Sequence, residues 1–598
     1  MRLHRTRRPR GEIRRTVCAL ALVSLACAGV PMATSVPGPP TPAGLTGEPT
    51  APPTPSPAPT YTATPPPSPA PTPAPNPRLD AEGVLILPQP LVAGDWLTVD
   101  VEPRLAGLEG DAVAEEGMTV SLALADGSVY TAQVAAAGLD GRPQARFHWV
   151  TRVPEPTGSA TPADASALIG WPITLTLELP ADVADADLTD NQLVVAAHFG
   201  ARDTLSPPEP ATRWLTRETG GLVLHYLSGS AAERDLEELV TDADAAYAFV
   251  TRRLSESEAP VDVYLLDRVI GQGGYASDEW VAVSYPDRKY SPVSLTSVLR
   301  HELTHRLDGA MGCDDAPALM REGLAVYMAG GHYHPGPIRE RAAALVPTIA
   351  YLPIDELTDG FYTHQHEIAY LEAGALISYL IDVYGWPVVG DMCETATAAS
   401  GADPERWAAA LDVLDLTTDI ETSWHAWLLS SGPDRAEAKQ LGLETELMDL
   451  MRAYQAAYDP GAHYLEGVLF DPAEAEGLGV VADFVRRPRS AEAIAVELVL
   501  AMAQEAVEQR DGALLAILIG ELRAALQEGV TASDLVSDAM TITARAQASG
   551  WEPYRLLIEG EGQFRVYVLN TRAWPQRSTL TARLRDGAWE LAGTIWSD

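Results

Sequence analysis

The stretch SVLRHELTHRLDGAMGCDDAPALMREGLAVY, residues 297–327, decides how the centre of this 598-residue chain folds. Leucine stands at every fourth position from 295 to 307, a spacing that predicts one buried stripe along a helix over 292–308. Ser291 and Pro292 suit the N-cap and the first residue of that helix. His301 and His305 are also four residues apart, so they project from one face, roughly opposite the leucine stripe.

The two histidines and the glutamate between them indicate a metal site. Tetrahedral zinc takes imidazole nitrogens at about 2.0–2.1 Å, and a separation of one helical turn allows both to bind. Glu302 would then stand beside a metal-bound water without being a ligand itself. The alternative is a charged, solvated helix face that happens to carry the same residues.

A catalytic zinc also needs a third protein ligand and an open fourth position. In the HExxHxxGxxH arrangement that ligand would fall at Met311, and Asp308 would replace the glycine, so this arrangement is excluded. Glu322 is the better candidate, on a second predicted helix. The segment between His305 and Glu322 is long enough for a helix–loop–helix return.

HELTH followed by REGLA at 321–325 resembles the gluzincin metallopeptidases of the thermolysin-like clan, most closely the bacterial peptidase MA-like domains. The similarity extends over about 211–455 and includes the strand segments LHY and WVAVSY and the helix AYLEAGALISYLIDVYG. It implies that His301, His305 and Glu322 bind Zn²⁺. It also implies that Glu302 is the general base, which deprotonates a zinc-activated water for attack on a peptide carbonyl.

Other residues are expected to complete such a site. Tyr370 is the candidate donor to the oxyanion, with His364 and His366 behind it, unless it is simply a packing tyrosine. The strand at 280–285 could bind the substrate backbone as an added strand. His332 and His334, in GGHYHPG, either bind a metal as a pair or form a polar loop at the rim of the cleft.

One departure from thermolysin concerns the residue four positions after the glutamate ligand. An acidic residue there orients one histidine in thermolysin, whereas this chain has Val326. The sequence predicts that Asp308 or Asp315 takes over this orienting role, unless both are surface residues.

The flanking regions predict further modules. Residues 1–30 combine a basic leader with an apolar run and indicate a signal peptide. Leu25-Ala26-Cys27 resembles the end of a bacterial lipobox, which leaves lipid attachment at Cys27 and simple cleavage both open. Residues 31–78 form a Pro/Thr/Ser-rich linker. Strand-like alternation predicts an immunoglobulin-like β-sandwich over 79–205, and residues 456–598 predict a small α+β domain without assigned chemistry.

Charge and cysteine content narrow the choice of partners. The net charge of −40 argues against nucleic acid or an anionic membrane surface as a partner, and a lipid on Cys27 would be the route to a membrane. Beyond the leader only Cys313 and Cys393 remain. In an exported protein they either form a disulfide or stay as two buried thiols.

These observations predict a multidomain fold, with an α+β thermolysin-like metallopeptidase domain between a β-sandwich module and a small α+β domain. The predicted function is that of an exported zinc metallopeptidase, secreted or attached to the surface of a bacterium, with a peptide or protein substrate. The alternative is a non-enzymatic surface binding protein with a structural or vestigial zinc site. Substrate, cleavage specificity and oligomeric state stay open.

Overall fold

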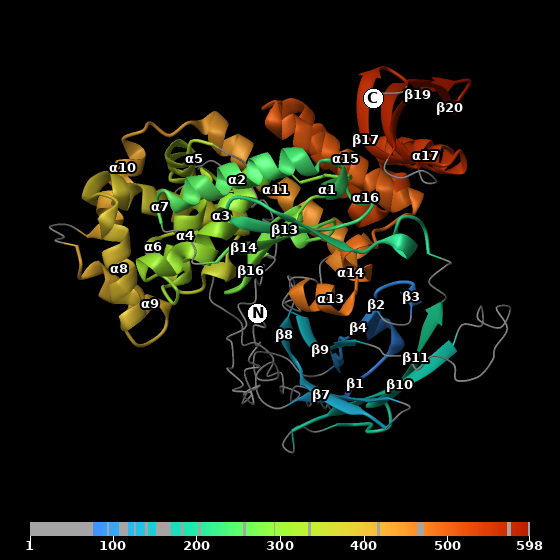
Figure 1. Ribbon diagram of the computed structural model, residues 1–598, viewed down its shortest axis with the longest axis horizontal. Helices are drawn as coiled ribbons and strands as arrows, with labels where there is room; N and C mark the ends of the chain where they lie inside the picture. Colours follow the sequence, from blue (N-terminus) through green and yellow to red (C-terminus); the bar gives the residue numbers. More distant parts are fainter. Residues whose placement is uncertain are drawn as a thin grey trace, which may run out of the picture.

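The computed structural model is a mixed α/β assembly of several sheets and many helices (Figure 1). It describes residues 76–92, 95–106, 118–124, 127–137, 142–150, 169–180, 185–200, 205–254, 259–291, 294–332, 336–414, 419–462, 472–570 and 576–595. The predicted signal peptide, most of the linker, Cys27 and His334 lie outside the described residues.

The N-terminal module is built from two facing sheets and a separate two-stranded sheet. Its strands are β1 (Asn76–Arg78), β2 (Val84–Leu87), β3 (Leu91–Val92), β4 (Trp96–Val101), β5 (Arg104–Ala106), β6 (Thr119–Leu124), β7 (Val129–Gln133), β8 (Ala135–Ala137), β9 (Arg142–Val150), β10 (Ile169–Glu178) and β11 (Gln192–Gly200). One facing sheet has the order β2-β4-β9-β8 and the other β3-β11-β10-β6-β7, while β1 pairs only with β5. Every second side chain along β6 and β10 points into the core between the two facing sheets. Leu122 and Ile173 are two of these core residues.

The central sheet has the order β12-β13-β14-β16-β15. Its strands are β12 (Trp214–Glu218), β13 (Leu222–Leu227), β14 (Val261–Leu266), β15 (Gly274–Ala276) and β16 (Trp280–Ser284). The inner strands β13, β14 and β16 run parallel, whereas β15 pairs with β16 antiparallel. Because β16 is paired on both sides, the prediction that 280–285 accepts a substrate strand is wrong. Among the described strands, β15 is the edge of the sheet at this side.

Helices α2 (Leu236–Thr251) and α3 (Leu295–Leu307) pack side by side, and α3 also contacts β15 and β16. The described helix α3 begins at Leu295 after Ser294, so the predicted start at Ser291 and Pro292 is wrong. After α3 the chain tightens into the 3₁₀ turn η5 (Asp308–Met311). It ends at Gly312, whose φ of 72° is the left-handed conformation that glycine adopts without strain.

Helices then build the rest of this region. They are α1 (Ala231–Arg234), α4 (Ala318–Ala329), α5 (Ile338–Leu345), α6 (Ile354–Thr358), η6 (Phe361–Thr363), α7 (His366–Tyr384), α8 (Pro387–Ala398), α9 (Asp403–Leu411), α10 (Ile420–Leu429) and α11 (Arg435–Tyr458). Helices α4 and α7 approach closely at two glycines. A Cβ on Gly323 would lie 2.6 Å from the carbonyl oxygen of Ala373, and one on Gly374 would lie 2.5 Å from Val326. The glycine of REGLA therefore lets α4 pack tightly on α7.

The C-terminal module contains α13 (Pro472–Leu478), α14 (Ala482–Val485), α15 (Ala491–Glu508), α16 (Gly512–Glu528), α17 (Asp534–Ala548), β17 (Trp551–Gly560), β18 (Gln563–Asn570), β19 (Arg577–Arg585) and β20 (Ala588–Ile595). The four strands form an antiparallel sheet in sequence order. Helix α11 runs through the predicted boundary at 455 and contributes residues to the core on both sides, Leu441 to one and Met448 to the other.

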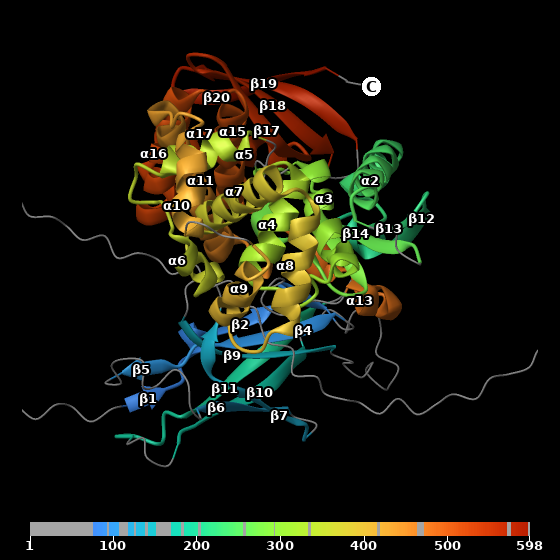
Figure 2. The ribbon, with the colours of Figure 1, turned by 90° about the vertical axis from the view of Figure 1, so that its left-hand side faces the viewer.

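Buried arginines join the modules. Arg288, between β16 and α3, forms ion pairs with Glu497 of α15 and Glu552 of β17. Arg486 of the C-terminal module forms ion pairs with Asp95 at 2.7 Å and with Glu209 at 2.6 Å. Figure 2 shows the sandwich at one end, β17–β20 at the other and helices α3–α11 between them.

Within the described part of the chain, no single helix is long and apolar enough to cross a membrane. Helices α7 and α8 taken together are long and apolar enough, but the chain bends by 119° at their junction.

Candidate metal centre

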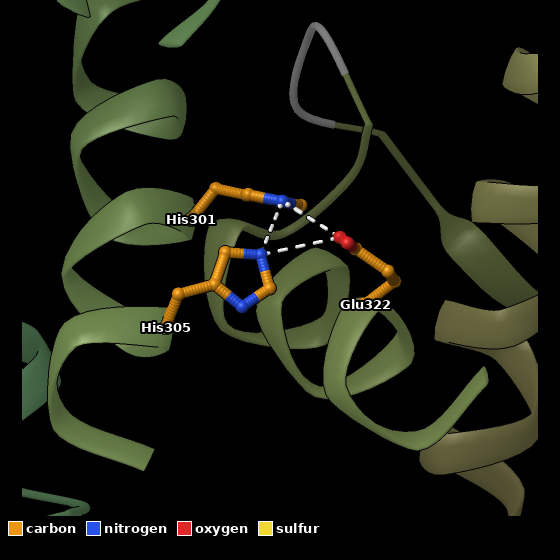
Figure 3. A group of neighbouring side chains, drawn as sticks. All are labelled: His301, His305 and Glu322. Carbon is orange, nitrogen blue, oxygen red and sulfur yellow. Dashed lines mark hydrogen bonds and ion pairs between the residues drawn. The ribbon is translucent and has the colours of Figure 1, made fainter. Parts of the chain in front are cut away.

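Three donor atoms converge between α3 and α4 (Figure 3). Nε2 of His305 lies 3.1 Å from Nε2 of His301 and 3.2 Å from Oε2 of Glu322, and the His301–Glu322 distance is 3.3 Å. Donors about 2.05 Å from a tetrahedral zinc would lie about 3.3 Å apart. The predicted ligands are therefore brought together at a spacing that fits one zinc ion.

The local fold explains this convergence. One helical turn of α3 places both imidazoles on the same side, while the η5 turn reverses the chain so that α4 returns beside α3. Cys313, in the loop between the two helices, forms a disulfide with Cys393 of α8. The sequence left this pairing open. The disulfide fixes the loop that separates His305 from Glu322.

Glu302 lies between the two histidines in the sequence and is buried, with 6% of its surface exposed. Its side chain faces the edge strand β15, since a Cβ placed on Gly274 would lie 2.9 Å from Cγ of Glu302. The same Cβ would lie 2.7 Å from Val298 and 2.8 Å from the carbonyl oxygen of Ala282. Glycine at 274 is therefore needed for β15 to approach α3 at the site.

Glu322 is held from its other side by Tyr362, the middle residue of η6. The Tyr362 hydroxyl donates a hydrogen bond to Oε1 of Glu322 at 2.8 Å, so Oε2 is left facing the histidines. Burial alone would raise the pKa of Glu322, but His305 and His301 hold it well below its usual value. Burial and the neighbouring carboxylate raise the pKa of Tyr362 well above its usual value. No local sequence pattern links Tyr362 to Glu322, which is 40 residues away, so this contact cannot be predicted from the sequence.

The two predicted orienting aspartates differ. Asp315 is exposed, so it does not take the predicted role. Asp308 is buried, and its Oδ2 forms an ion pair with Nε of Arg321 at 3.3 Å. Burial raises the pKa of Asp308, although Arg321 and His305 act in the opposite direction. Nδ1 of His305 is buried without a hydrogen-bond partner among the described residues, so neither aspartate bonds to it. The residue that orients a metal ligand here is Tyr362, which binds the carboxylate of Glu322.

Tyr370 lies beside the metal centre in a stack of rings. Its ring centroid is 6.1 Å from that of His301, 4.4 Å from His332 and 4.2 Å from His366. His366 therefore packs behind Tyr370 as predicted. His364 does not, because its Nε2 donates to the backbone carbonyl of Glu356 at 2.9 Å.

A second polar cluster adjoins the first. Nδ1 of His332 lies 2.8 Å from Oε2 of Glu367, and the other oxygen of Glu367 accepts a 3.1 Å bond from Arg452. Burial lowers the pKa of His332 against the opposing effect of Glu367. Burial, Arg452 and His332 hold the pKa of His366 well below its usual value. His332 is thus a partly buried residue that pairs with Glu367 and stacks on Tyr370 close to the metal centre.

Comparisons with known proteins add little to this geometry. No known family profile matches the sequence, and no curated protein matches it. Two similar solved structures are of leukotriene A4 hydrolase from yeast, one in complex with bestatin and one native, from Saccharomyces cerevisiae. Both share 11% identity with this chain, with TM-scores of 0.27 and 0.26. The matches cover 74% and 72% of this chain and 93% and 83% of those chains. Scores this low carry no argument about activity.

Proposed function

We propose that this chain is an exported, zinc-dependent peptide hydrolase of the gluzincin type. The observation that carries the proposal is the 3.1–3.3 Å triangle of His301, His305 and Glu322, with the carboxylate of Glu302 buried on the same helix. Two imidazoles and one carboxylate leave a fourth position of a tetrahedral zinc for water or substrate.

The residues of this chain have distinct roles in the proposed reaction. When bound, the zinc ion would supply Lewis-acid polarisation of a peptide carbonyl and make a water molecule easier to deprotonate. Glu302 takes the proton of the attacking water and returns it to the leaving amine nitrogen. Tyr370, whose ring lies beside that of His301, is the proposed donor to the developing oxyanion. Tyr362 keeps the ligand carboxylate of Glu322 in position.

Strand β15 supports a peptide as the substrate. It is the last described strand of the central sheet, and Gly274 at its start lies against Glu302. An extended peptide can add to such an edge through backbone hydrogen bonds, and this mode would bring its carbonyl groups past the metal centre. Strand β15 thus takes the substrate-binding role that was predicted for 280–285.

Export is also part of the proposal. The basic leader and apolar run at 1–30 indicate a secreted chain, and the Cys313–Cys393 disulfide is consistent with an oxidising compartment. A lipid on Cys27 would place the enzyme on the cell surface. The acidic charge argues against nucleic acid as a partner.

The test uses the purified chain with zinc, assayed on unfolded casein and a peptide library. Glu302→Gln is expected to retain zinc and to lower kcat/KM by at least about 10²-fold, because the variant lacks the proton acceptor. Glu237→Gln, on an exposed carboxylate of α2, is the matched control and should leave hydrolysis unchanged. Unchanged turnover in Glu302→Gln would contradict the assigned mechanism. Zinc binding without hydrolysis by the unaltered chain would favour a binding protein with a structural zinc.

A further inference from the structure

A second group of metal-ligating side chains lies next to the first and has no role in the proposed reaction. It consists of His332, just after α4, and His366 and Glu367, the first two residues of α7. One ligand atom from each lies within 4.8 Å of the others. The rings of His332 and His366 are 4.9 Å apart between centroids.

The chemistry of this group suits a divalent transition metal. Two imidazoles and a carboxylate are ligands that zinc and similar ions accept. Arg452 bonds to one oxygen of Glu367, and the other oxygen faces His332. A tetrahedral zinc holds its donors about 3.3 Å apart, so side-chain rotations would have to bring these donor atoms, now within 4.8 Å of one another, closer around an ion.

A cavity beside the cluster provides room for the remaining ligands. It measures about 40 Å³, and both His332 and Glu367 line it. One water molecule needs about 10–15 Å³, so the cavity has room for about three. Water molecules there can complete the coordination sphere of an ion held by the three side chains.

We propose that His332, His366 and Glu367 form a second site for a divalent transition metal, weaker than the site at His301, His305 and Glu322. The weakness follows from Arg452, whose positive charge contacts Glu367 and opposes a cation. The two sites are neighbours, because the rings of His301 and His332 are 6.2 Å apart between centroids.

The experiment counts metal and requires no hydrolysis, so it can fail or succeed independently of the proposed peptidase activity. The full chain, stripped with a chelator, is titrated with Co²⁺ while the visible d–d absorption and the bound metal per chain are recorded. We expect one tight and one weaker equivalent of Co²⁺. His366→Ala and, separately, Glu367→Gln should weaken the second equivalent by at least about tenfold and leave the first in place.

Controls separate this result from misfolding. Retention of the tight equivalent shows that each variant is folded at the first site. Glu322→Ala should do the reverse, losing the tight equivalent and keeping the weak one. His364→Ala removes a nearby histidine that bonds to a backbone carbonyl and should change neither equivalent. A single equivalent in the unaltered chain, or a second one that survives both His366→Ala and Glu367→Gln, would overturn the proposal.

Discussion

The hydroxyl of Tyr362 donates to Oε1 of Glu322 at 2.8 Å, across 40 residues of sequence. This contact joins the segment before α7 to the carboxylate that α4 presents to His301 and His305. Rotation of Glu322 would break both its bond to Tyr362 and its contacts with the histidines. The position of the third ligand therefore depends on a residue outside the motif.

Tyr362→Phe should weaken zinc binding by about 10–100-fold, which is the usual effect of losing a residue that orients a metal ligand. The ring still fills its site, so the fold should be retained. Zinc affinity measured by competition with a chromogenic chelator checks this. Tyr351→Phe removes another Tyr–Glu hydrogen bond, to Glu421, away from the metal centre, and serves as the control. Equal affinities in Tyr362→Phe and the unaltered chain would show that Tyr362 is not needed to position Glu322.

Gly274→Ala should lower kcat/KM by about 10²-fold with zinc content unchanged. The added methyl group would overlap Val298, the carbonyl of Ala282 and Cγ of Glu302, so β15 and Glu302 must move apart. Displacements of this size at a catalytic group commonly cost about 10²-fold. Gly520→Ala, in α16 where a Cβ has open space, is the control and should leave activity unchanged. Full activity in Gly274→Ala would remove β15 from the proposed site.

Contacts between residues close together in the sequence can be predicted from it, whereas contacts made by tertiary packing cannot. His301 and His305 are fixed relative to each other by one helical turn, and Glu322 returns through a short loop, so local spacing is sufficient to propose all three. Tyr362 reaches Glu322 only through the packing of the segment before α7. Strand β15 has three residues, too few to show an alternation, and its partner β16 was taken for the edge. Helix α11 contributes residues to two cores, and no local sequence pattern marks where one core ends and the other begins.

Cys313→Ala should lower the free energy of unfolding by about 4 kcal/mol, because the disulfide closes a loop of 80 residues. Urea unfolding of metal-free protein measures this change without a contribution from zinc. A reductant should lower the midpoint of the unaltered chain towards that of the variant and should not affect the variant itself. Equal midpoints for Cys313→Ala and the unaltered chain would show that the disulfide adds nothing to stability.

Glu372→Gln should change how stability depends on pH. Glu372 is fully buried on α7, and burial raises the pKa of its carboxyl well above the usual value. The backbone N–H of Leu352 opposes this shift, and Glu421 and Glu356 reinforce it. In the unfolded chain the carboxyl loses its proton near pH 4.3, whereas in the folded chain it keeps it to higher pH. Above about pH 4.3 the folded state therefore binds more protons, and stability falls as pH rises, by up to about 1.4 kcal/mol per unit until the folded pKa is reached.

Glutamine cannot ionise, so the variant should lack this slope and should be the more stable protein at pH 8. Urea unfolding of both proteins at intervals from pH 5 to 8 gives the difference in free energy directly. Glu340→Gln, an exposed side chain on α5, controls for the loss of one carboxyl group from an acidic protein. A gap between Glu372→Gln and the unaltered chain that widens with pH supports a neutral buried Glu372. Parallel curves would mean that this carboxyl has the same proton occupancy in the folded and unfolded chains.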